Sequence, residues 1–147
     1  MRQATALAFD AELEPVDGIH AALAEITSPV CVASNGPMSK LTHALALTKL
    51  LGHFEGRIFS AYEVGSWKPD PGLFLHAAQT MGAQPSACVV VEDSLSGARA
   101  ARAAGMKVLG FAGGRPDAEQ ELAAFCDGVF HRMSDLPSLL ACPAVRA

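Results

Sequence analysis

The segment that decides the fold of this chain reads VVVEDSLSGARAARAAGM and covers residues 89–106. It begins inside a continuous apolar run over 87–91, of the kind that forms a central parallel strand covered on both faces. The adjacent carboxylates Glu92 and Asp93 follow directly, and a helix of small residues then extends to Gly105. A buried strand, an acidic pair and a helix in this order predict one unit of an α/β sheet.

Shorter apolar runs and helical patterns alternate on both sides of this segment. Besides the run at 87–91, strands are expected at 30–33, 57–61, 108–111 and 129–130. Periodic apolar residues between the strands predict helices, and the clearest of these run from Pro37 to Gly52 and from Asp70 to Gly82. Strands that alternate with helices at this spacing form right-handed crossovers. The predicted fold class is therefore α/β, a three-layer sandwich around a parallel, Rossmann-like sheet.

Composition excludes several classes of protein. Half of the 147 residues are hydrophobic and 18% are charged, as in a single folded domain. The net charge is −4 without any run of Lys or Arg, so a nucleic-acid partner is not expected. No apolar stretch approaches the ~20 residues that cross a bilayer, and no signal peptide is recognisable, so we expect a cytoplasmic protein without a membrane partner. The four cysteines form no metal-binding pattern and are expected to be buried thiols.

Polar side chains suited to an anion follow two of the expected strands. Ser34, Asn35 and Gly36 come after the first strand and precede a helix, while Lys68 lies in the loop after the second. A serine hydroxyl and the backbone N–H groups of Asn35 and Gly36 can donate to a phosphoryl oxygen, and Lys68 can neutralise its charge. Because the carboxyl ends of parallel strands meet at one edge, these groups are expected to converge there.

The acidic pair Glu92 and Asp93 follows a third strand and is expected at the same edge. Mg²⁺ prefers carboxylates together with water and substrate phosphate, so this pair is the candidate metal site. Each group also has an ordinary structural explanation, because serine caps helices, loop lysines are solvated and acidic pairs complement helix N-termini. The order of all these groups at successive strand ends is what favours phosphoryl chemistry.

These residues resemble the conserved motifs of the haloacid dehalogenase superfamily of phosphohydrolases. The run VASNG at 32–36 is similar to its second motif, and WKPDPGLF at 67–74 resembles its third. The segment at 89–106 resembles the fourth motif, with the acidic pair after an apolar strand. Within the superfamily, the chain is most similar to the β-phosphoglucomutase and phosphoglycolate phosphatase branch, and within that branch to sugar-phosphate phosphatases acting on 6-phosphogluconate.

The resemblance implies a Mg²⁺-dependent hydrolase of a small phosphorylated metabolite that works through an aspartyl-phosphate. Ser34 and Lys68 would bind and stabilise the transferring phosphoryl group, with further donors from Asn35 and Gly36. Glu92 and Asp93 would be the Mg²⁺ ligands, with Asp93 the stronger candidate. The Lys68–Pro69 bond is expected to be cis, as it often is in this branch.

The first motif of the superfamily, Asp-x-Asp-Gly-Thr at the end of a central strand, occurs nowhere in the sequence. It supplies the nucleophile and the general acid/base, and a helical cap of several dozen residues normally separates it from the second motif. We therefore expect an N-terminally truncated chain, in which residues 1–13 are a remnant of the last cap helix and residues 14–147 form the core. The alternative is a degenerate first motif at 6–12, with Asp10 as nucleophile.

This expectation has consequences for stability and activity. Without the first strand, two inner strands would expose unpaired backbone groups, so we expect rearrangement or self-association through the incomplete sheet. The chain alone is expected to lack phosphatase activity. The alternatives are a non-catalytic phosphate-binding relic and a phosphosugar mutase. A phosphoacceptor receiver domain is disfavoured, because its acidic pair comes first and its lysine last, whereas here Ser34 and Lys68 precede Glu92.

Overall fold

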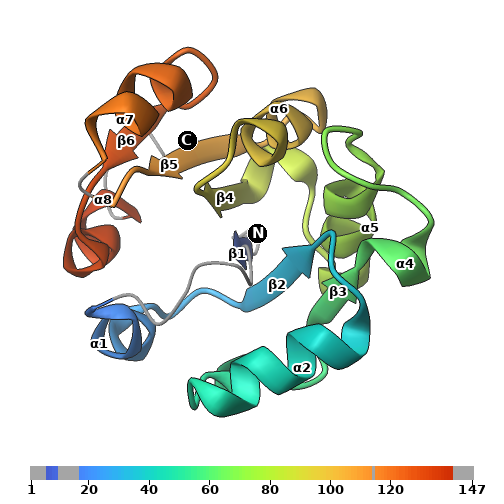
Figure 1. Cartoon of the computed structure of the whole chain (residues 1–147). Helices are drawn as coiled ribbons and strands as arrows, with labels where there is room; N and C mark the ends of the chain where they lie inside the picture. Colours follow the sequence, from blue (N-terminus) through green and yellow to red (C-terminus); the bar gives the residue numbers. More distant parts are fainter. Residues whose placement is uncertain (1–5, 10–16, 114, 141–147) are drawn as a thin grey trace, which may run out of the picture.

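The centre of the molecule is a six-stranded parallel sheet, shown in a computed structural model that describes residues 6–9, 17–113 and 115–140 (Figure 1). All five strand pairings are parallel. The α/β class and the parallel sheet predicted from the sequence are thus confirmed. In spatial order the strands are β3 (Ile58–Ser60), β2 (Val30–Ser34), β1 (Ala6–Phe9), β4 (Cys88–Glu92), β5 (Lys107–Phe111) and β6 (Gly128–Phe130).

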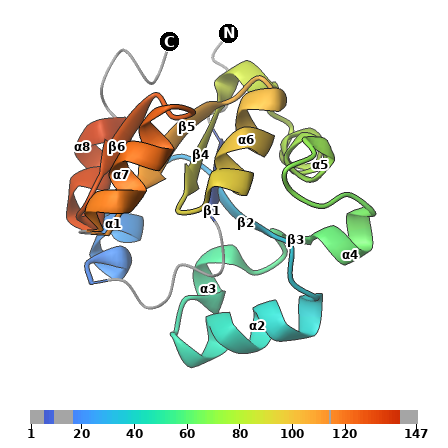
Figure 2. The ribbon, with the colours of Figure 1, turned by 45° about the horizontal axis from the view of Figure 1, so that its top comes forward.

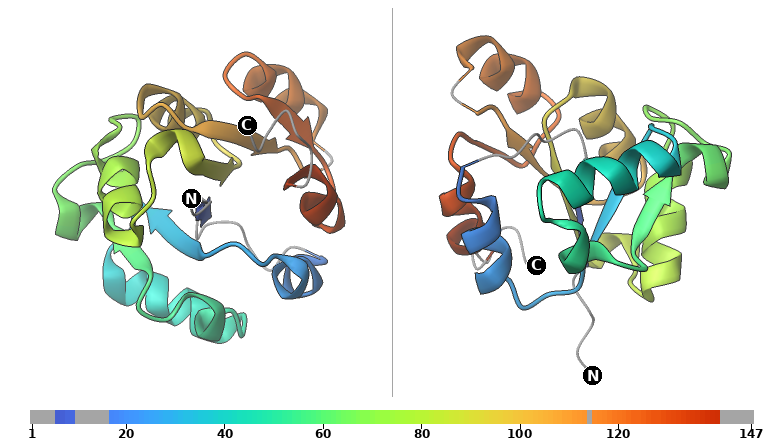
Figure 3. Two further views of the ribbon diagram at one scale, coloured as in Figure 1. Left: turned by 180° about the vertical axis from the view of Figure 1, so that it is seen from behind. Right: turned by 60° about the horizontal axis from the view of Figure 1, so that its bottom comes forward.

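Helices pack against both faces of this sheet (Figures 2 and 3). One face is covered by α5 (Gly72–Met81), α6 (Leu95–Ala103) and α7 (Pro116–Ala123). The other is covered by α1 (Ile19–Glu25), α2 (Met38–Leu47), α3 (Leu51–Phe54) and α8 (Leu136–Leu140). Short connecting turns are α4 (Ala61–Val64), η1 (Pro85–Ala87) and η2 (Met133–Asp135).

The continuous apolar run of the central strand is explained by these two layers. Cys88 and Val90 of β4 belong to the core on the side of α5 and α6, whereas Val89 and Val91 belong to the core on the side of α1 and α8. Alternate residues of a strand point to opposite faces, so a strand buried on both sides needs apolar residues at every position. The sequence pattern therefore identified one of the two central strands correctly.

The expected cap helix at the N-terminus is wrong for the residues that the structure describes there. Ala6–Phe9 form strand β1, which lies between β2 and β4 (Figure 3, left). Leu7 is in register with Val30 on one side and with Val89 on the other. A strand at this place satisfies the backbone of three strands at once, whereas a short helix would satisfy only its own. Tertiary pairing therefore overrides the helix propensity of alanine-rich sequence.

Two related expectations change with β1. The sheet has no gap at its centre, so the expectations of a missing first strand and of a separate unit over 1–13 are wrong for residues 6–9. Self-association was expected because the sheet would be incomplete, and the presence of β1 removes that reason. β1 ends at Phe9 and α1 begins at Ile19. Asp10, the nucleophile of the alternative interpretation, lies outside the described residues.

Smaller differences concern the ends of helices. The helix expected up to Gly52 ends at Leu47, where Lys49 takes a left-handed backbone with φ 62°, and α3 begins afterwards. In contrast, Gly82 ends α5 as expected, with φ 73°. None of the helices within the described ranges is long and apolar enough to span a membrane.

Candidate active site at the carboxyl edge of the sheet

The buried polar side chains of the described residues gather at the carboxyl edge of the sheet. Four are buried: Ser34 and Ser60 at the ends of β2 and β3, Glu92 at the end of β4, and Lys68 from the loop after α4. Burying polar groups is costly unless they are paired, and a charge costs most. Their concentration at one edge of an otherwise apolar core is the arrangement that the sequence predicted for the site.

Lys68 and Glu92 form a buried ion pair at the centre of this edge. Lys68 Nζ lies 2.9 Å from Glu92 Oε2, and the two side chains are 3% and 0% exposed. The same ammonium donates to the carbonyl oxygen of Ala33, 3.0 Å away, and lies 5.2 Å from the centre of the Phe74 ring. The structure thus brings together Lys68 and Glu92, which are 24 positions apart in the sequence. The Lys68–Pro69 peptide is cis, as expected.

The second carboxylate oxygen of Glu92 is held by the loop that follows it. Glu92 Oε1 accepts hydrogen bonds from Asp93 N at 3.1 Å, Ser94 N at 3.3 Å and Ser94 Oγ at 3.0 Å. Ser94 also caps α6, because its Oγ accepts from Gly97 N at 3.2 Å. Both oxygens of Glu92 therefore face donors of the protein. This carboxylate acts first as the counter-ion of Lys68 and as the anchor of the α6 N-terminus.

Gly97 has no side chain and so leaves the space that the Glu92 carboxylate occupies. A Cβ at position 97 would lie 2.0 Å from Glu92 Cδ. The Gly97→Ala variant is expected to push the carboxylate off Lys68 and to lower the free energy of unfolding by about 3 kcal/mol. Urea denaturation followed by circular dichroism measures this loss. Gly52→Ala is the control, because nothing lies within 4 Å of its Cβ position, and it should be neutral or slightly stabilising. Equal stabilities of the two variants would contradict the assignment.

Ser34 lies beside the ion pair with a hydroxyl proton still to donate. Its Oγ accepts from Gly36 N at 3.1 Å, which uses a lone pair and leaves the O–H available to an oxygen of a ligand. The Gly36 N–H, expected from the sequence as an anion donor, thus already has an acceptor within the chain. The turn is held from the other side, because Ser60 Oγ donates to Gly36 O at 2.6 Å.

Asp93 is the more accessible carboxylate of the acidic pair. It is half-buried, whereas Glu92 is fully buried. Within the described part of the chain, no three His, Cys, Asp or Glu side chains lie close enough to hold a metal. A single accessible carboxylate completed by water and a ligand phosphate is a set that Mg²⁺ commonly takes, and Asp93 is a carboxylate of this kind. Glu92 would join only by giving up one of its present donors.

Arg115 is a residue of this edge that the sequence reasoning missed. It follows β5, and its Nη2 donates to the carbonyl oxygens of Asp93, at 3.4 Å, and of Phe111, at 3.5 Å. Its Nε donates to Ala112 O at 2.9 Å. Arg115 thus connects the loop after β4 with the loop after β5. Its position in the loop after a parallel strand, by the rule that selected Lys68, could have identified it.

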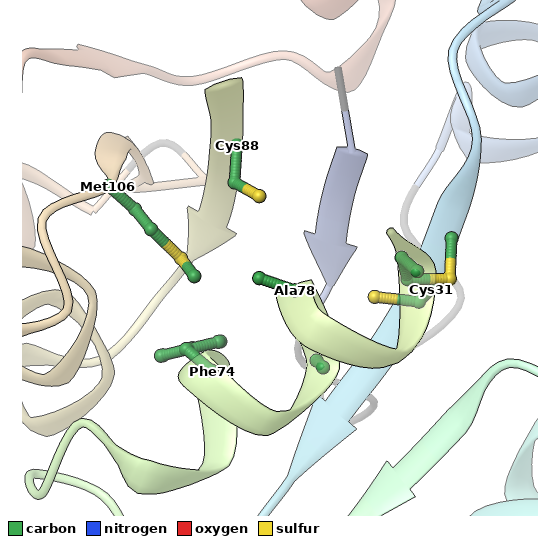
Figure 4. A pocket seen from close by; sticks show the side chains of 7 residues that line it. Cys31, Phe74, Ala78, Cys88 and Met106 are labelled. Atoms are coloured by element: carbon green, nitrogen blue, oxygen red, sulfur yellow. The ribbon is translucent and has the colours of Figure 1, made fainter. Parts of the chain in front are cut away.

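A small apolar pocket lies elsewhere, between α5 and the sheet (Figure 4). Cys31 and Cys88 line it together with Phe74, Ala78 and Met106. Burial raises the pKa of the Cys31 thiol to about 12, and the nearby Cys88 adds to the shift. The thiol therefore stays protonated near neutral pH and is a poor nucleophile. As the sequence suggested, these cysteines are small buried side chains of the core.

Comparisons with known proteins agree with this geometry. The family model of the haloacid dehalogenase-like hydrolases matches residues 2–105. The 6-phosphogluconate phosphatase of Escherichia coli K12 is 43% identical over 110 residues, which are 75% of this chain and 50% of that protein. The fructose-1-phosphate phosphatase YqaB of the same organism is 44% identical over 78 residues, 53% of this chain and 41% of that protein. The chain thus spans half or less of the length of these curated relatives.

Solved structures share the fold. A haloacid dehalogenase-like protein of unknown function from Agrobacterium tumefaciens C58 is 39% identical with a TM-score of 0.83, over 86% of this chain and 60% of that one. The L-2-haloacid dehalogenase of Xanthobacter autotrophicus is only 20% identical, with a TM-score of 0.77 over 90% of this chain and 63% of that one. At that identity the likeness concerns the fold alone.

Proposed function

Because the chain belongs to the family of haloacid dehalogenase-like hydrolases, we propose that its carboxyl-edge site binds the phosphoryl group of a small sugar phosphate. The observation that carries this proposal is the ammonium of Lys68. The ammonium is buried at the end of β2, where Ser34 lies, and is fixed 2.9 Å from Glu92. A charge that is shielded from water in this way interacts more strongly with a phosphoryl oxygen. Two relatives named as phosphatases of sugar phosphates support the substrate class.

In this proposal each described residue has a separate task. Ser34 Oγ–H donates to one phosphoryl oxygen, and the Lys68 ammonium offsets the charge of another. Asp93 holds Mg²⁺, which when bound supplies positive charge to the phosphoryl group. Glu92 keeps the Lys68 ammonium in place. Phosphoryl transfer depends mostly on positioning and electrostatic stabilisation, which are the functions this set of residues can perform.

The nucleophile is the part of the reaction that the described residues do not supply. Asp10 is the next residue after β1 in the sequence, but Glu12 stands where the family has its second aspartate and Gly-Thr is absent. We therefore propose that the chain of residues 1–147 binds phosphate and Mg²⁺ without hydrolysing phosphomonoesters at a measurable rate. A phosphate-binding relic would share this behaviour, and a mutase would differ in converting a sugar bisphosphate intermediate.

Two measurements on purified 1–147 test the proposal. Titration calorimetry with inorganic phosphate in the presence of Mg²⁺ is expected to show binding that weakens without the metal. The absence of any binding would overturn the site. An assay with an aryl phosphate and Mg²⁺ is expected to show no turnover. Turnover that disappears in Asp10→Asn would overturn the inactivity and assign Asp10 as the nucleophile.

A further inference from the structure

The side chain of Asn35 is paired with the peptide groups of Lys68 rather than turned to the anion site. Lys68 N donates to Asn35 Oδ1 at 2.9 Å, and Asn35 Nδ2 donates to Lys68 O at 3.4 Å. The two residues are 33 positions apart in the sequence, so the contact ties the loop before α5 to the end of β2. One short side chain must supply both an acceptor and a donor for this arrangement, which asparagine does and aspartate and alanine do not.

The other end of Lys68 is held by the same strand. Its ammonium donates to Ala33 O at 3.0 Å, so Ala33 and Asn35, two positions apart at the end of β2, bind the tip and the backbone of one lysine. A lysine side chain carries roughly 2 kcal/mol of rotamer entropy when it is free. Anchoring it at both ends removes that freedom before a ligand arrives, so an anion would meet an ammonium already in place.

We propose that Asn35 is a positioning residue that sets the ammonium of Lys68 for phosphoryl binding, and that its side chain does not itself contact the phosphoryl group. This proposal rests on the proposed function above. It adds to the backbone N–H of Asn35, expected from the sequence as an anion donor, an action of the side chain through Lys68. It also explains why Asn35, at the edge of an anion site, uses its side-chain amide to bind a peptide group of the protein.

Hydrogen exchange at the Lys68 amide tests the contact itself. In the full chain, Asn35→Ala is expected to speed exchange of this amide about 10-fold, because its acceptor is lost, an effect equivalent to about 1.4 kcal/mol. Asn35→Asp keeps an acceptor oxygen and should stay within about 3-fold of the native rate. The control is Gln79→Ala, which removes an exposed amide from α5. An exchange rate unchanged in Asn35→Ala would overturn the proposal.

A double-mutant cycle tests the action through Lys68. Trp67 is the only tryptophan of the chain and immediately precedes Lys68, so its fluorescence can report the binding of inorganic phosphate. Asn35→Ala is expected to weaken phosphate binding about 10-fold in the native chain and less than about 2-fold in the Lys68→Met/Glu92→Gln background. An equal loss in both backgrounds would mean a direct contact and would overturn the proposal.

The two experiments also separate this proposal from the proposed function. In one outcome, the native chain binds no phosphate while Asn35 still protects the Lys68 amide from exchange. The proposed function then fails, and the role of Asn35 in phosphoryl binding is overturned, although its contact with Lys68 is real. If phosphate binds and the amide is unprotected, the function stands and the role of Asn35 is overturned. The proposal is supported only if Asn35→Ala speeds exchange of the Lys68 amide and if its effect on phosphate binding depends on Lys68.

Discussion

Replacing Lys68 with methionine is expected to lower the free energy of unfolding by about 3–5 kcal/mol. The change leaves the carboxylate of Glu92, which is 0% exposed, as an uncompensated charge inside the protein. Methionine is nearly the same length as the lysine stem, so the loss comes from the charge rather than from a cavity. Urea denaturation of the variant and the native chain measures the difference. A loss below about 1 kcal/mol would contradict the buried ion pair.

The double variant Lys68→Met/Glu92→Gln separates stability from function. Because it removes both charges and keeps an oxygen for the donors of the Ser94 loop, it should recover most of the stability that Lys68→Met loses. Phosphate binding should stay weakened by about 30-fold in both, since a hydrogen bond to a charged donor is lost in each. Lys40→Met, an exposed position in α2, is the control and should change neither quantity.

Deleting residues 1–9 is expected to abolish cooperative folding. Without β1, the edges of β2 and β4 that now pair with it would face each other across a gap in the middle of the sheet. Each buried backbone group left without a partner costs about 1–3 kcal/mol, so several of them together are comparable with the 5–15 kcal/mol that typically stabilises a domain. The shortened chain should therefore lose its urea transition and associate with other copies through the exposed strand edges.

Light scattering after size-exclusion chromatography and circular dichroism measure this effect. The control is deletion of residues 1–5, which leaves Ala6–Phe9 intact and should preserve the urea midpoint. Adding a synthetic peptide of residues 1–12 to the shortened chain should restore part of the transition. A monomeric 10–147 chain with an unchanged midpoint would show that β1 is dispensable and would favour the cap-helix interpretation of this segment.

The site residues could be predicted because parallel sheets bring chemistry to one place. Once Ser34, Lys68 and Glu92 are assigned to loops after strands, the topology requires that they meet at one edge, whatever the details of packing. The partners of these residues could not be predicted. Glu92 binds Lys68 and Asn35 binds the Lys68 backbone across more than twenty residues of sequence. Contacts between such distant segments are set by the tertiary structure.

The sequence by itself determined the α/β class, the buried central strand, expected at 87–91 and found at 88–92, and the group of residues at the carboxyl edge. Local periodicity and turn residues carry that information, and it does not depend on the rest of the fold. Only the tertiary structure decided the state of Ala6–Phe9. This segment has helical propensity by itself, and it becomes a strand because β2 and β4 each present an unpaired edge to it. The partners on both sides, rather than the segment, set its conformation.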